Sequence, residues 1–203
     1  LSELLRRKET DGGPWQASAR AIEQAIAADP VRFWRAVPLR HQPALLHLLD
    51  ELGISGGLAL DEVVGVLRGA AEANSASQLA ANGRYVYALT HVVLARSRYF
   101  RQPVDAAPLA FAIPVLRQAI ASRLSGPMDV FDLDLVGEAV ASLQILRADD
   151  DAATAAGRRH LIALQRPDGG WGTGEDATPR RIHPTFNAVV ALVPTPAAWD
   201  RPA

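Results

Sequence analysis

The histidine at position 183 has the surroundings of a chemically active side chain. In the stretch HPTFNAVVAL, His183 precedes Pro184 at the mouth of an apolar run. Proline favours the first position of a helix and biases the preceding residue away from helical geometry, so we expect His183 to cap a helix that begins at Pro184. A helix N-terminus disfavours imidazolium, and neutral imidazole is the form that binds a metal or accepts a proton. The alternative is a capping histidine that only hydrogen-bonds to backbone.

Two further residues stand out because they are polar in apolar surroundings. Glu138 lies between two valines, and a buried glutamate is rare without a partner. The candidate partners of Glu138 are a histidine, Arg84 and Arg117. His91 lies inside the apolar segment YALTHVVL, where a lone histidine is more often a satisfied core residue than a ligand.

Together, these three residues support two kinds of chemistry. If His91, Glu138 and His183 lie on three adjacent inner helices, they form a site of two histidines and one carboxylate for a divalent metal such as zinc. Without a metal, Glu138 and His183 form an acid–base pair. Both interpretations make His183 and Glu138 the catalytic residues, and the first makes all three metal ligands. The remaining histidines are expected on the surface: His41, His47 and His160.

The elements that would position these residues are helices. Apolar residues recur at helical spacing, and no segment reads convincingly as a strand. The expected helical segments are residues 14–30, 31–37, 41–53, 59–74, 77–97, 105–126, 132–147, 149–165 and 184–193. We expect Pro114 to kink the sixth segment and Asp132 to cap the seventh, whose apolar character suggests an inner ring. The fold class is all-α, with stacked helical hairpins.

A glycine-rich turn joins the last two segments. Asp168 and Gly169 form a strong turn signal, and Trp171 follows among glycines that allow close backbone approach. The indole can bury a large area over neighbouring helix ends, and Gln165 can bind loose backbone groups at the preceding helix end. We interpret this turn first as a structural clamp between adjacent hairpins.

The stretches QRPDGGWG and HPTFNAVVAL resemble the QW repeat, and the helix that follows it, of the terpene-cyclase and protein-prenyltransferase superfamily. The resemblance is best over residues 149–193 and indicates an uncharacterised bacterial branch. It implies an α/α toroid and, by position, matches His183 to the zinc-binding histidine of prenyltransferase β-subunits. The chain departs from the family in three ways: Ala148 replaces the first Asp of the cyclase Asp-X-Asp-Asp motif, cysteine is absent, and aromatic residues are only 6%. Because the chain is short for a closed ring, we expect a partial or small toroid.

Composition limits the partners and the compartment. The net charge is −1, so the chain lacks an electrostatic footprint for nucleic acid. No apolar run approaches the roughly 18 residues of a membrane span, and no signal peptide is visible, so a cytoplasmic protein is expected. We expect one α-helical domain over residues 1–203. A turn near 55–57 suggests an N-terminal helical subdomain (1–57) before a toroid-like part (58–193) and an extended tail (194–203).

Two functions from different classes remain open. The first is an enzyme or pocket protein of bacterial secondary metabolism, in which a central cavity lined by His183, Glu138 and His91 takes a small, isoprenoid-like molecule. The second is a non-catalytic helical scaffold that binds a partner protein. An enzyme requires a pocket that His183 and a carboxylate share, whereas a scaffold requires a filled centre and an exposed apolar patch.

Overall fold

The computed structural model describes residues 14–126, 129–172 and 179–193. Within these ranges every regular element is a helix and no strand is present, which confirms the all-α class. The elements are α2 (Pro14–Ala28), α3 (Pro30–Ala36), η1 (Leu39–His41), α4 (Gln42–Glu51), α5 (Leu60–Ala73), α6 (Ala76–Ala81), α7 (Gly83–Arg96), η2 (Ala107–Leu109), α8 (Ala112–Leu124), α9 (Val130–Ile145), α10 (Ala152–Ala163) and α11 (Pro179–Leu192). None of these helices is both long enough and apolar enough to span a membrane.

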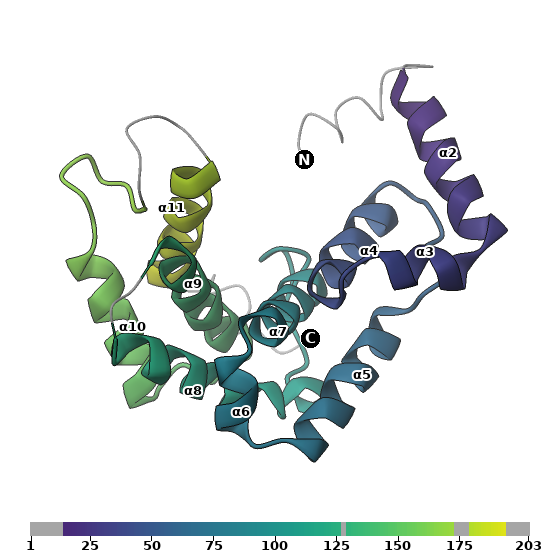
Figure 1. The fold of residues 1–203 in the computed structure, drawn as a ribbon. Helices are drawn as coiled ribbons and strands as arrows, with labels where there is room; N and C mark the ends of the chain where they lie inside the picture. The colour runs from purple at the N-terminus through teal and green to yellow at the C-terminus, as the bar shows by residue number, and fades with distance from the viewer. Residues whose placement is uncertain (1–13, 127–128, 173–178, 194–203) are drawn as a thin grey trace.

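The helices form two curved layers of stacked hairpins (Figure 1). Helices α4, α7, α9 and α11 lie side by side in an inner row. Helices α5, α6, α8 and α10 cover the outer side of that row. From α6 onward the chain alternates between the outer and inner layers, as expected for stacked hairpins, and α4 and α11 lie at opposite ends of the inner row.

Helix α9 is at the centre of the packing. Every residue from 133 to 146 is buried, because α7, α8, α10 and α11 all pack against this helix. Close packing with α10 depends on Gly157, where a Cβ would lie 2.9 Å from Cγ2 of Val140. Any polar side chain on α9 is therefore held inside the protein core.

Side-chain caps move several helix ends from their expected positions. Asn82 caps α7 and thereby divides the expected segment 77–97 into α6 and α7. Asp129 caps α9, so Asp132 is the third residue of that helix rather than its cap. The expected kink at Pro114 is also wrong, because Pro114 is the third residue of α8 and its missing N–H has no helical partner to lose there.

The glycine-rich turn clamps α10 to α11. Trp171 is buried, and its indole N–H donates to the carbonyl of Leu161 in α10 at 2.6 Å. The backbone N–H of Trp171 donates to Oγ1 of Thr185 in α11 at 2.9 Å. Gln165 donates to the carbonyl of Gly169 at 3.0 Å, and Gly169 has a φ of 82° that suits glycine. This turn holds α11 in register against the rest of the inner row.

The N-terminal helices add a small second core. Ile26, Trp34, Leu49 and Ile54 are buried together, and Leu46 and Leu58 contact both this cluster and the main one. The two cores are therefore continuous through shared side chains. The subdomain boundary near residue 57 stays a prediction, and the tail at 194–203 lies outside the described residues.

Candidate functional site

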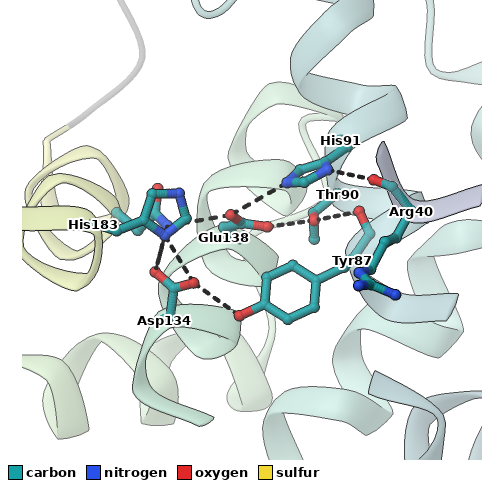
Figure 2. A network of polar contacts seen from close by, with 8 residues as sticks. Arg40, Tyr87, Thr90, His91, Asp134, Glu138 and His183 are labelled. Atoms are coloured by element: carbon teal, nitrogen blue, oxygen red, sulfur yellow. Dashed lines mark hydrogen bonds and ion pairs between the residues drawn. The ribbon is translucent and has the colours of Figure 1, made fainter. Parts of the chain in front are cut away.

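Three neighbouring inner helices each present a pair of polar side chains four residues apart. Residues at this spacing share one face of a helix, so each pair points in one direction. The pairs are Tyr87 and His91 on α7, Asp134 and Glu138 on α9, and His183 and Asn187 on α11. Figure 2 shows that these faces meet in one polar network running from α11 across α9 to α7.

Asp134 and His183 form the outer part of the network. Nδ1 of His183 lies 2.8 Å from Oδ1 of Asp134, and because a carboxylate only accepts, Nδ1 is the donor. The same Asp134 also accepts hydrogen bonds from Tyr87 Oη at 2.8 Å and from Asn187 Nδ2 at 2.7 Å. The Asp134 side chain is 8% exposed, whereas that of His183 is 57% exposed. The imidazole is therefore oriented by a buried carboxylate and still reaches solvent.

Glu138 forms the inner part of the network. Its side chain is 2% exposed, and its Oε2 accepts a hydrogen bond from Thr90 Oγ1 at 2.5 Å. Its Oε1 accepts from Asn187 Nδ2 at 3.2 Å and lies 3.6 Å from Nε2 of His91. Asn187 thus bridges the two carboxylates, and Glu138 is enclosed by protein groups.

His91 is held at the far end of the network by the backbone of η1. Its Nδ1 donates to the carbonyl of Arg40 at 2.6 Å, which directs Nε2 toward Glu138. Burial lowers the pKa of His91, but the hydrogen bond to Glu138 and its negative charge outweigh burial and leave the pKa raised. Protonation of this ring therefore places a positive charge beside a buried carboxylate.

The electrostatics of His183 differ from the sequence expectation. Helix α11 begins at Pro179, so His183 lies in its second turn and does not cap it, and Pro184 lies inside the helix. The cap prediction is therefore wrong, and the helix dipole, which acts mainly within the first turn, has little effect on the ring. The hydrogen bond to Asp134 raises the pKa of His183, burial opposes this, and the charges of Asp134 and Glu138 add to the rise.

A glycine brings the two carboxylates and His183 together. Gly137 of α9 faces Asn187 of α11, and a Cβ at Gly137 would lie 3.0 Å from the backbone carbonyl carbon of Asn187. The absence of a side chain at this position allows α11 to approach α9 closely. This approach places His183 over Asp134 and Asn187 between the acidic groups.

The structure brings all three sequence-predicted residues into the network, although their functional roles stay predictions. His91 and Glu138 face one another directly, whereas His183 contacts Asp134 rather than Glu138. The proposed arginine partners are elsewhere: Arg84 is exposed, and Arg117 pairs with Asp151 at 3.1 Å. The aspartates at 149–151 lie at the start of α10, which Asp151 caps.

Sequence reasoning missed Asp134 and Asn187, and it did not place Tyr87 in one site with His91. The signal that could have identified them is their spacing, because each lies four residues from a residue that was singled out. On an otherwise apolar inner helix, a second polar residue at this spacing extends the same polar face.

Asp134, Glu138 and His183 could hold a metal ion. One ligand atom from each lies within 4.8 Å of the others, and Asp134 and Glu138 are buried. This set has two carboxylates and one histidine, and it differs from the predicted set by having Asp134 in place of His91. The carboxylate oxygens already accept hydrogen bonds, so a cation would have to displace the proton on Nδ1 of His183.

Comparison with known proteins identifies one family. Residues 3–185 match the family model described as "Domain of unknown function (DUF6895)". No curated protein and no solved structure matches the chain.

Proposed function

The chain belongs to the DUF6895 family, whose description assigns no function, and we propose from the site itself that it is an enzyme acting on a small molecule by general acid–base catalysis. In this proposal His183 exchanges a proton with the substrate, and Asp134 orients the imidazole. The observation that carries the proposal is the 2.8 Å hydrogen bond between a buried carboxylate and a half-exposed imidazole.

The geometry suits proton transfer at Nε2 of His183. Because Nδ1 donates to Asp134, the ring is fixed in one tautomer and Nε2 is the nitrogen left for a substrate. The hydrogen bond to Asp134 raises the pKa of His183 above the ordinary value for histidine, which favours the protonated ring as a proton donor.

Glu138 and His91 have positioning roles in this proposal, because Glu138 is too deeply buried to reach a substrate. The negative charge of Glu138 favours the protonated form of His183, and His91 balances the second carboxylate. The resemblance of the glycine-rich turn to the QW repeat supports extending the proposal to isoprenoid-like substrates and to bacterial secondary metabolism.

A comparison of turnover tests this proposal. Purified wild type and His183→Gln are incubated with a panel of isoprenoid alcohols, isoprenoid diphosphates and small carbonyl compounds, and consumption is followed by mass spectrometry. We expect turnover by wild type and a loss of about 100-fold or more in the variant. His160→Gln, on outer helix α10, is the matched control and should keep full activity. Equal turnover by wild type and His183→Gln would contradict a catalytic role.

A metal-dependent form of the same site is the nearest variant of this proposal, and the 4.8 Å cluster of ligand atoms favours it. Elemental analysis of protein purified without chelator distinguishes the two forms. A stoichiometric divalent metal in wild type that is lost in His183→Ala supports the metal-dependent form. Metal-free wild type with full turnover excludes it.

A scaffold function remains the second candidate because α11 exposes apolar side chains. The exposed large hydrophobic residues of α11 and of the position that follows it recur at helical spacing: Ile182, Phe186, Val189 and Val193. An exposed apolar stripe of this kind is typical of an interaction surface. A stable partner complex that is lost in Phe186→Ser but kept in His183→Gln would favour the scaffold function.

A further inference from the structure

A separate cavity lies between α4, the loop that follows it and the end of α7. Its volume is about 380 Å³, within the range of small-molecule sites. None of the residues of the His183 network lines it. Its apolar wall consists of Leu46, Ile54, Leu58, Leu60 and Ala95. The cavity can therefore enclose an apolar group of modest size.

A buried histidine lines this cavity with an unused polar atom. His47 is 7% exposed, which corrects the expectation that it lies on the surface, and its Nε2 has no hydrogen-bond partner among the described residues. Burial lowers the pKa of His47, so the ring is neutral near pH 7. Because an unpaired buried polar atom is costly, its position beside a cavity points to a hydrogen-bond partner outside the described residues, a role that a bound ligand can fill.

Two arginines line the same cavity. Arg98 pairs at 2.8 Å with Asp50, which also lines the cavity, and Arg96 pairs with Asp61. The aspartate side chains are 62% and 77% exposed, and ion pairs this exposed are weak. An anion inside the cavity can therefore replace these carboxylates as the partner of the guanidinium groups.

The segment that carries Arg98 forms one wall of the cavity and has an unusual backbone conformation. Arg98, Tyr99 and Phe100 have φ values of 48°, 53° and 68°, and three consecutive non-glycine residues in the left-handed region are rare. The turn is held by Tyr99 N–H donating to the carbonyl of Leu94 at 2.8 Å. It places the Tyr99 ring against that of His47, with centroids 4.9 Å apart. Backbone strain of this kind is concentrated at functional sites.

From these four observations we propose that this cavity is a binding site for a small organic anion with an apolar body. The anionic group pairs with Arg98 and Arg96, the apolar body lies against Leu46 and Leu58, and Nε2 of His47 hydrogen-bonds to the ligand. The proposal goes beyond the acid–base function, since it concerns a second site made of other residues.

Isothermal titration calorimetry of the full chain tests the proposal with three probes that share an eight-carbon chain. Octanoate and octyl phosphate carry an anionic group, whereas octan-1-ol is neutral. We expect at least one anionic probe to bind about tenfold or more tightly than the alcohol, because charge-assisted hydrogen bonds are the stronger ones. The stronger of the two anionic probes identifies carboxylate or phosphate as the preferred group.

Substitutions of cavity residues test whether the anionic probe binds in this cavity. We expect Arg98→Gln and His47→Leu each to lower the affinity for the anionic probe by about tenfold. His47→Leu removes an unpaired polar atom, so it should fold at least as stably as wild type. Arg159→Gln, which removes an exposed arginine of α10, is the charge-matched control and should bind like wild type.

Three results would overturn the proposal. They are absence of binding by both anionic probes, equal affinity for octan-1-ol, and unchanged binding by Arg98→Gln and His47→Leu. Loss of binding in Phe186→Ser would place the probe on the apolar face of α11 and would also overturn it.

Discussion

At the scale of single residues, the network balances two buried carboxylates with two imidazoles. Asp134 and Glu138 are both nearly inaccessible, and each faces one histidine. Burying a charge is costly unless it is paired and hydrogen-bonded, and Thr90, Tyr87 and Asn187 supply neutral donors to these oxygens. The protonation state of the histidines therefore decides how stable the site is.

The first prediction concerns the pKa of His183. We expect a value above that of an unstructured histidine, because the Asp134 hydrogen bond favours the protonated ring. Asp134→Asn removes this charge and should lower the pKa toward or below about 6.5. Ring-proton NMR titration measures both values, with His41 of the same protein as the internal reference. An unchanged pKa in Asp134→Asn would mean that the dyad does not form in solution.

The second prediction concerns the pH dependence of stability. Both His183 and His91 have raised pKa values in the folded state. Their contribution is therefore complete below the unfolded pKa of about 6.5 and is lost as pH rises through the folded values. From about pH 6 to about pH 8 these two histidines should lower the free energy of unfolding in urea, whereas His41 and His47, whose pKa values are lowered, act in the opposite direction. The double variant His91→Gln, His183→Gln should show a shallower fall, and an equal fall would contradict this assignment.

The third prediction concerns Glu138. Replacing it by alanine removes one of the two acceptors of Thr90 and of Asn187, which keep the carbonyl of Tyr87 and Asp134 respectively. It also leaves His91 without its opposite charge. We expect a loss of about 3 kcal/mol or more in the free energy of unfolding. Glu72→Ala on the exposed face of α5 should change stability by less than about 0.5 kcal/mol. A similar small effect at Glu138 would show that the network adds nothing to folding.

At the scale of helices, the site depends on how closely α9 and α11 approach. Gly137 sets this distance, since any larger residue meets the backbone of Asn187. The fourth prediction is that Gly137→Ala costs about 1–3 kcal/mol and reduces the pKa shift of His183 by moving it from Asp134. Gly69→Ala in α5 is the control, because a Cβ there meets no atom within 4 Å. That substitution should be neutral or stabilising by up to about 1 kcal/mol. Equal effects of both substitutions would contradict the close-approach argument.

The sequence predicts which segments are helical, but it does not predict where each helix ends or which side chains pair with one another. Apolar periodicity located α5 and α10, which each bury one face, and the apolar composition of α9 marked a helix that is buried on every side. The start of α11 was placed too late because Pro184 was interpreted as the first helical residue, although the helix tolerates it internally. The pairing of His183 with Asp134 spans 49 residues, and local pattern carries no information about contacts at that separation.

At the scale of the whole molecule, the arc has a strong centre and weaker ends. In stacked helical arrays each hairpin contacts only its neighbours, so terminal hairpins have fewer stabilising interfaces. Here α9 is enclosed by four helices, whereas α2 contributes only Ile26 to the buried residues described for it. The polar network lies between α7, α9 and α11, close to the centre of stability rather than at the N-terminal end.

The fifth prediction follows from this gradient and bears on the expected division near residue 57. Native-state hydrogen exchange should give the backbone amides of α9 a free energy of opening close to that of global unfolding. The amides of α2 and α3 should open at lower free energy, because the buried residues described for their core are few: Ile26, Trp34, Leu49 and Ile54. Trp34→Leu, which removes the hydrogen bond to Gly56, should lower protection in α3 while leaving that of α9 near the wild-type value. Equal opening free energies for α2 and α9 would instead mean that Leu46 and Leu58 join the two cores into one cooperative unit.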